Sequence, residues 1–246
     1  MEKKNSLPRA TAEMAQRYNE MLKIDMIELN SDQLAALNEE YADMEENYDW
    51  YNYEFTDPAT GKVGVKDVAG NILVPALYDG ACYFEHYMGR PHAPHVMMRD
   101  GKCGIVAADG SGQEFTKFDY EYAVPINYTP FYAVWLEGDK HIGIIARDGT
   151  VLVDNILTKY YEPFGSCMVI ERDGKKGVIE MVTMQVVAPE YDDIDIEPGE
   201  YVTFTLNGVQ GRVDENGKFY TLEEADQLDL PNSEIDFVYD DHEYSY

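Results

Sequence analysis

The chain has 246 residues, of which 45% are hydrophobic, and this is enough for a sizeable folded core. Its formal net charge of −28 repels phosphate groups, so we expect binding neither to nucleic acid nor to an anionic membrane. Three cysteines are too few for a disulfide scaffold, and their odd number is typical of a reducing compartment.

The first thirty residues contain no long apolar stretch. Charged and amide side chains interrupt the apolar positions between residues 10 and 29, so the sequence predicts no signal peptide there. No run approaches the ~18 apolar residues that a membrane span needs. We therefore predict a cytoplasmic location.

Residues 1–48 are predicted to form an α-helical hairpin. Met14, Tyr18 and Met21 recur at helical spacing, which makes one apolar stripe. Ser31 is a good N-cap for a second helix, which we expect to run to about Glu46. The methionines of the stripe are expected to pack on the remainder of the chain, because Met commonly fills irregular gaps in a core.

A β-rich domain is predicted over residues 49–225, followed by an acidic tail over 226–246. Tyr51, Tyr53 and Phe55 alternate with polar residues, which indicates a strand. Beyond this strand, Asp-Gly and Asn-Gly pairs recur between short apolar runs, and these pairs favour tight hairpin turns. The tail alternates acidic with aromatic residues and is expected to be solvated, although its aromatics also suit a linear contact segment.

The β-rich domain repeats itself about five times. A segment of the form Gly-Lys-x-Gly-Val recurs at intervals of 34 to 40 residues, and its second glycine, here called the anchor glycine, falls at Gly64, Gly104, Gly143, Gly177 and Gly211. A large apolar residue follows fourteen positions later in four copies: Tyr78, Phe118, Leu157 and Tyr191.

Each copy reads as a three-stranded antiparallel β-meander. In the second copy the expected strands are His95–Arg99, Cys103–Ala107 and Gln113–Phe115. A glycine inside a strand costs stability, so its recurrence suggests that a backbone or an aromatic ring passes close above it. We predict an array of about five such units, stacked as an open superhelix or, alternatively, closed like a propeller.

The pattern Gly-Lys-x-Gly-Val, then Asp-Gly, then Val-Pro-x-x-Tyr-Asp resembles the WG-repeat (KWG-repeat) proteins of bacteria. The first copy runs from Gly61 to Asp79, and the fourth combines Asp173–Val178 with Ala188–Asp192. The resemblance spans about residues 51–222. The tryptophan that names the family is replaced before each anchor glycine, by Val63, Cys103, Ile142, Lys176 and Gln210. The resemblance implies an all-β repeat array used for binding, without catalytic residues, and it carries over no functional site.

Two clusters of potential metal ligands stand out. His86, His92 and His95 lie close to Cys82 and have ligand types suited to zinc, but their spacing matches no closed structural zinc site. The acidic run Asp192, Asp193, Asp195 and Glu197 lacks the glycine and distal glutamate of a calcium-binding loop. We expect solvent-facing side chains in both places and predict no metal and no cofactor.

No catalytic motif is present. The sequence contains no nucleophile elbow, phosphate-binding loop, dinucleotide fingerprint or zinc-protease helix. Cys82, Cys103 and Cys167 lie in or near apolar strands, where buried, inert thiols are the expectation. The sequence therefore points to no individual catalytic residue and predicts that the protein is not an enzyme.

The predicted function is a non-enzymatic binding or scaffold module. Its acidic surface, with 20 tyrosines in the chain, would recognise a protein partner, especially a basic one, as an inhibitor or immunity-type protein does. The first alternative is a carbohydrate or cell-wall binding module that uses Tyr78-Asp79 and Tyr191-Asp192. The second alternative is a metal-dependent enzyme around residues 86–95.

Overall fold

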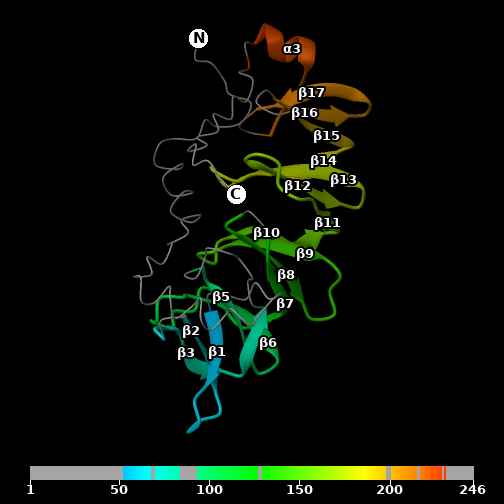
Figure 1. The fold of residues 1–246 in the computed structure, drawn as a ribbon. Helices are drawn as coiled ribbons and strands as arrows, with labels where there is room; N and C mark the ends of the chain where they lie inside the picture. The colour runs from blue at the N-terminus through cyan, green and yellow to red at the C-terminus, as the bar shows by residue number, and fades with distance from the viewer. Residues whose placement is uncertain are drawn as a thin grey trace, which may run out of the picture. The chain divides into compact units, whose positions relative to one another are not determined.

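The fold is mainly β, and its strands pair in antiparallel sheets (Figure 1). A computed structural model describes residues 52–67, 70–83, 93–126, 129–197, 201–214, 217–228 and 230. The predicted helical hairpin of residues 1–48 lies outside the described residues, as does most of the predicted tail.

The chain divides into two compact units, and the boundary falls within one strand. The first unit contains residues 52–126 and 130–155, whereas the second contains Thr129 and continues from Ile156 onward. The first unit holds a three-stranded sheet of order β1-β2-β3 and a seven-stranded sheet of order β10-β9-β8-β7-β6-β5-β4. Their strands are β1 (Asn52–Thr56), β2 (Val63–Asp67), β3 (Ile72–Tyr78), β4 (Gly80–Tyr83), β5 (His95–Arg99), β6 (Lys102–Val106), β7 (Tyr120–Pro125), β8 (Phe131–Leu136), β9 (Ile142–Ala146) and β10 (Val151–Leu157).

The second unit holds two four-stranded sheets and a short helix. The sheets have the orders β11-β12-β13-β14 and β15-β16-β17-β18. The helix begins with a capping box, in which the side chains of Thr221 and Glu224 each accept a bond from the other's backbone N–H. The elements are β11 (Lys159–Tyr160), β12 (Cys167–Arg172), β13 (Lys175–Glu180), β14 (Gln185–Tyr191), β15 (Asp193–Glu197), β16 (Tyr201–Leu206), β17 (Val209–Val213), β18 (Phe219–Thr221) and α3 (Leu222–Gln227).

The prediction of three-stranded units is confirmed for the sheet β1-β2-β3 and wrong for the sheets of four and seven strands. Four short strands, β4, β7, β11 and β15, pair with the strand that follows each of them. One residue stands directly before each of these four strands. We call these four residues the transition residues: Asp79, Asp119, Thr158 and Asp192. The expected third strand at 113–115 is also reduced, to a single bridge between Glu114 and Val106.

The backbone of three transition residues is held in the same way. Asp79 N–H donates to Met98 O, Thr158 N–H to Glu171 O and Asp192 N–H to Thr205 O, each at 2.8 Å. In every case the acceptor lies two residues before the tight turn of the next hairpin. The chain therefore leaves one group of strands and enters the next by one recurring geometry. The number of repeats stays a prediction.

Two of the anchor glycines, Gly64 and Gly177, lie where the neighbouring strand bulges. In β2–β3, Val65 pairs with Val74 and Val63 with Tyr78, and in β13–β14, Val178 pairs with Val187 and Lys176 with Tyr191. Three residues of the longer strand therefore oppose one glycine. A proline stands in each bulge, Pro75 or Pro189, where its missing N–H costs no ladder bond.

None of the five anchor glycines has room for a side chain. A methyl group at Gly64 would lie 2.5 Å from Val74 O, and one at Gly104 would lie 2.8 Å from the Phe118 ring. At Gly143 the obstacle is the Asn155 side chain, and at Gly177 and Gly211 it is backbone of the neighbouring strand. The predicted close approach of a backbone or an aromatic ring is therefore confirmed at four of the glycines, whereas at Gly143 an amide side chain takes that place.

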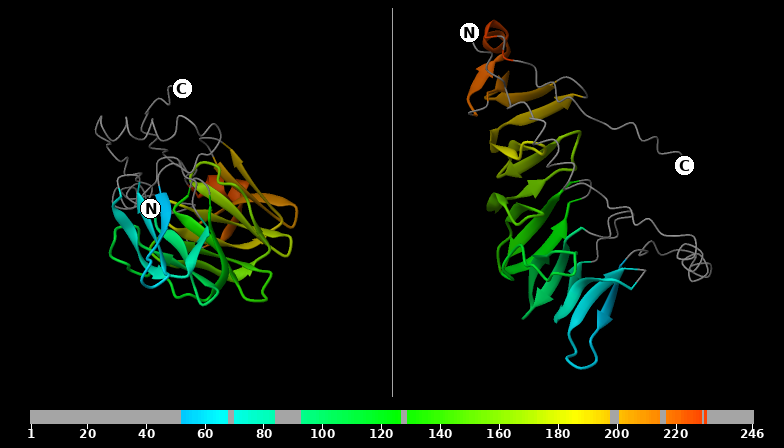
Figure 2. Two further views of the ribbon diagram at one scale, coloured as in Figure 1. Left: turned by 60° about the horizontal axis from the view of Figure 1, so that its bottom comes forward. Right: turned by 90° about the vertical axis from the view of Figure 1, so that its left-hand side faces the viewer.

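Each unit has its own apolar core. In the second unit, residues of β12–β14 and of β15–β17 share one cluster, so the two sheets pack against each other (Figure 2): Cys167, Val178, Val187, Tyr191, Ile194, Val202, Phe204 and Val213. In the first unit one cluster joins β2 and β3 to β5 and β6, and a second lies within the seven-stranded sheet.

We expect Gly177→Ala to lower the free energy of unfolding by about 1–3 kcal/mol, because the added methyl group overpacks the backbone of β14. Hydrogen exchange should show faster exchange of the β13–β14 amides. The control is Gly174→Ala, in an exposed turn where an added methyl group meets nothing within 4 Å and only the positive φ is unfavourable. Equal exchange in the β13–β14 ladder of both variants would contradict the steric explanation.

Candidate functional site

The Tyr-Asp pairs that suggested a carbohydrate platform hold the fold together instead. Tyr78 is fully buried and Tyr191 is 5% exposed. The Tyr78 ring stacks on Phe118 with centroids 5.6 Å apart, and the Arg99 guanidinium lies 4.4 Å from the centroid of Phe118. Burial raises the pKa of both tyrosine hydroxyls. Neither ring can stack on a sugar, so the residues named for this alternative were wrong.

Two transition residues, Asp79 and Asp192, tie their own hairpin to the next one through their side chains. Asp79 accepts from Lys62 Nζ at 2.7 Å and from the Asp100 backbone N–H at 2.7 Å. Asp192 binds Lys175 in the same way and accepts from the N–H of Gly208 at 3.4 Å. Hydrogen bonds from these lysines hold the pKa of each carboxyl below its usual value.

Thr158 replaces the acid at the third of these positions. Its hydroxyl accepts from the Asp173 N–H at 3.3 Å, at the turn between β12 and β13. Asp79, Thr158 and Asp192 thus all cap the first turn of the following hairpin. No such contact is formed by the Asp119 side chain among the described residues.

Buried carboxylates form a second set of caps, which the sequence reasoning missed. Asp67, Glu180 and Asp214 stand three residues after an anchor glycine and are at most 5% exposed. Each accepts backbone N–H groups of the turn that follows: Asp67 from Asn71 at 2.8 Å, Glu180 from Thr183 at 2.6 Å and Asp214 from Lys218 at 2.9 Å. Their constant offset from the anchor glycine was a usable signal.

The acidic run after β14 is held by lysines. Asp192 pairs with Lys175 and Asp193 with Lys176. Hydrogen bonds from these lysines lower the pKa of both carboxyls. Two of the four acids considered for calcium are thus engaged with cations of the protein. In the described ranges, no group of three or more His, Cys, Asp or Glu side chains is placed to hold a metal ion.

The histidine cluster is only partly described. His86 and His92 lie outside the described residues. His95 is 3% exposed at the start of β5, with its Nε2 3.2 Å from Asn52 Nδ2. The expectation that these histidines face solvent was therefore wrong for His95.

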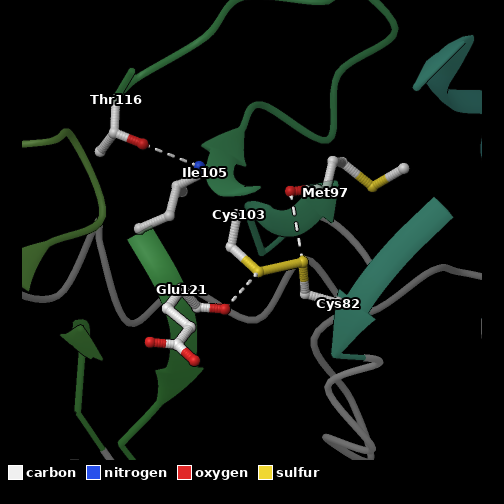
Figure 3. Close-up of a disulfide and its surroundings, with 6 residues drawn as sticks. All are labelled: Cys82, Met97, Cys103, Ile105, Thr116 and Glu121. Carbon is white, nitrogen blue, oxygen red and sulfur yellow. Dashed lines mark hydrogen bonds between the residues drawn. A yellow bond between two sulfur atoms is a disulfide. The ribbon is translucent and has the colours of Figure 1, made fainter. Parts of the chain in front are cut away.

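Two of the three cysteines are joined, which the cysteine count did not predict. Cys82 of β4 and Cys103 of β6 form a disulfide with Cα atoms 6.3 Å apart (Figure 3). Cys167 is fully buried, and burial raises the pKa of its thiol to about 12. The prediction of a buried, inert thiol is confirmed for Cys167 and wrong for Cys82 and Cys103.

The surface keeps an excess of unpaired acid. Besides the pairs above, Arg99 binds Glu114, Lys102 binds Glu137 and Arg212 lies 3.5 Å from Asp226. Several exposed acids form no ion pair or side-chain hydrogen bond with any described residue: Asp119, Asp154, Glu162, Glu190 and Asp195. Six of the described lysines and arginines thus pair with carboxylates of the same chain, while these five carboxylates face water.

Comparison with known proteins identifies no family. No family model matches the chain, and no curated protein sequence matches it. Among solved structures, PorZ of Porphyromonas gingivalis, described as a bacterial surface component of the type-IX secretion system, is similar at 11% identity and a TM-score of 0.27, over 65% of this chain and 24% of PorZ. The N-terminal domain of Nup159 is similar at 9% identity and a TM-score of 0.23, over 52% of this chain and 40% of that domain. The chain thus spans less than half of either protein. No helix in the described part of the chain is long and apolar enough to cross a membrane.

We expect Asp192→Asn to lower the melting temperature at neutral pH, because both the Lys175 pair and the cap on the following turn are weakened. The lowered pKa of Asp192 means that its contribution is complete above the unfolded-state pKa and is lost as the pH falls through the folded-state value. The difference in melting temperature between wild type and variant should therefore shrink from about pH 5 to about pH 2.

Asp195→Asn is the matched control, because it removes an acid of the same region that has no described partner. It should change the melting temperature little, both at neutral pH and at about pH 2. An Asp192→Asn effect that stays constant down to the lowest pH would contradict the ion-pair explanation.

Proposed function

We propose that this chain is a non-enzymatic binding module of the WG-repeat type that recognises a protein partner of net positive charge. An inhibitor or an immunity-type protein that masks a cationic target is one concrete form. The observation that carries the proposal is the division of charge on the described surface. Six described lysines and arginines pair with carboxylates of the same chain and the exposed Lys117 and Lys140 do not, whereas exposed acids such as Asp119, Asp154 and Glu190 stay unpaired.

This division favours a basic protein over other partners. Free carboxylates attract cations at long range and speed the encounter with a partner of opposite charge. The same field repels phosphate, so nucleic acid and anionic membranes are not expected partners. Glu190 lies on β14, in the hairpin whose turn is capped by the buried Glu180, so a partner meets this charge already in place.

The first alternative, a carbohydrate module, has less support from the structure than from the sequence alone. Its stacking residues Tyr78 and Tyr191 are buried, and their neighbours Asp79 and Asp192 are bound to lysines. The second alternative, a metal-dependent enzyme, gains no ligand set from the described residues.

The cytoplasmic location stays a prediction, but its cysteine argument no longer holds. Two cysteines form a disulfide, and such bonds persist in oxidising compartments and are usually reduced in the cytosol.

The proposal is tested by capturing partners on the immobilised full chain and then measuring their association rates. Proteins captured at about 50 mM salt should be basic, and their capture should weaken at about 300 mM, because the Debye length shortens. A variant that combines Asp119→Asn, Asp154→Asn, Glu190→Gln and Asp195→Asn should associate about tenfold more slowly with the main purified partner.

The control variant adds negative charge by converting two exposed glutamines to glutamates. Gln113→Glu with Gln210→Glu should speed association with the same partner, because both side chains are exposed. Equal rates for both variants and the wild type, or binding indifferent to salt, would overturn the charge argument.

A further inference from the structure

The bond between Cys82 and Cys103 joins two strands that are not neighbours. The strand order β6-β5-β4 places β5 between them, and β4 is the last strand of its sheet. In the β4–β5 ladder Ala81 pairs with Met97 and Tyr83 with Val96, so Cys82 is the extra residue of a bulge. The bulged Cys82 leaves the ladder, and its sulfur reaches Cys103 with the Cα atoms 6.3 Å apart.

Each sulfur also lies near a backbone carbonyl (Figure 3). Cys82 Sγ is 3.5 Å from Met97 O, and Cys103 Sγ is 3.7 Å from Glu121 O. In the disulfide the sulfurs carry no hydrogen, so these two sulfur–oxygen contacts are not hydrogen bonds. After reduction, each thiol would have an acceptor already within reach, so neither buried S–H would be left without a partner. The surroundings therefore suit both the oxidised and the reduced pair.

The two sulfurs differ in access. Cys103 is 4% exposed and packs in the core of the seven-stranded sheet, whereas Cys82 is only partly buried at the edge of that core. Thiol–disulfide exchange requires an attacking thiolate to reach one sulfur. Cys82 is the sulfur open to attack, and Cys103 is the buried leaving group.

We propose that Cys82 and Cys103 form a redox modification site, at which a dithiol reductant releases the edge strand β4. A thiolate of the reductant attacks Cys82 Sγ, the S–S bond breaks, and Cys103 leaves as a thiolate that takes up a proton. The second thiol of the reductant then attacks the mixed disulfide and releases Cys82 as a thiol. The reductant is oxidised to its own disulfide by loss of two electrons, and the two cysteines gain two electrons and two protons.

Release acts on an edge strand of this sheet. β4 has four residues, and its ladder to β5 is interrupted by the bulge at Cys82. Without the covalent link, the strand is held by this short ladder, by the packing of Ala81 on the core and by the hydrogen bond from Asp79 N–H to Met98 O. An opened β4 would uncover the backbone N–H and C=O groups of β5, which is a surface that can pair with another strand. This proposal is independent of the charge-based function above.

The test uses the full chain, titrated with dithiothreitol and followed by two mass-spectrometric readouts. Alkylation in denaturant should modify only Cys167 in the oxidised protein and all three cysteines after reduction. Hydrogen exchange of β4 and of the facing β5 amides should become at least tenfold faster on reduction, while β8 and β9 keep their protection.

The Cys82→Ser/Cys103→Ser variant is the matched control. Its β4 should exchange rapidly from the start and should not respond to dithiothreitol, whereas Cys167→Ala should respond as the wild type does. Three alkylated cysteines in the air-oxidised protein would overturn the proposal. So would unchanged β4 exchange after reduction, or a loss of protection that spreads through β8 and β9 as well.

Discussion

The neighbouring backbone that passes close above Gly64, Gly177 and Gly211 is the constraint on which the rest of the fold depends. At Gly64 and Gly177 the opposing strand bulges over the glycine, and a proline occupies the bulge. The bulge shifts the register so that Tyr78 and Tyr191 enter the core four residues after the last regular pair. The residue after each tyrosine, Asp79 or Asp192, then bonds through its backbone N–H to the following hairpin. A side chain on either glycine would separate the strands and move every later contact.

The transition residues connect this geometry to the surface charge. Asp79 and Asp192 each bind a lysine and cap a turn. The carboxylates and the lysines at these positions are therefore already paired within the chain. Buried carboxylates such as Asp67 and Asp214 satisfy further turn N–H groups. Of the −28 formal charge, therefore, one part stabilises hairpins and another part, at positions such as Asp154 and Glu190, faces solvent. Only the second part is available to a partner.

The hairpins were predictable from the sequence because their turns need unusual backbone angles. Asp173-Gly174 and Asn207-Gly208 adopt positive φ at both residues, which few other residue pairs tolerate. The short strands after the transition residues were not predictable, because two to six residues carry too little periodicity to distinguish a strand from a loop. The role of Tyr191 also stayed open, since tyrosine suits both a core and a binding surface. The disulfide depends on the bulge at Cys82, for which the residues around it give no signal.

Three of the transition residues, Asp79, Thr158 and Asp192, contact the hairpin that comes next along the chain. Thr158 contacts the turn at Asp173, and Asp192 contacts the turn at Gly208. A block that runs from one transition residue to the next therefore includes the residue that bonds it to the following hairpin. Duplication of such a block in the gene would add a segment whose ends already fit both neighbours, and deletion would leave two ends that still join. A chain built in this way can change length over evolutionary time without redesign of its interior.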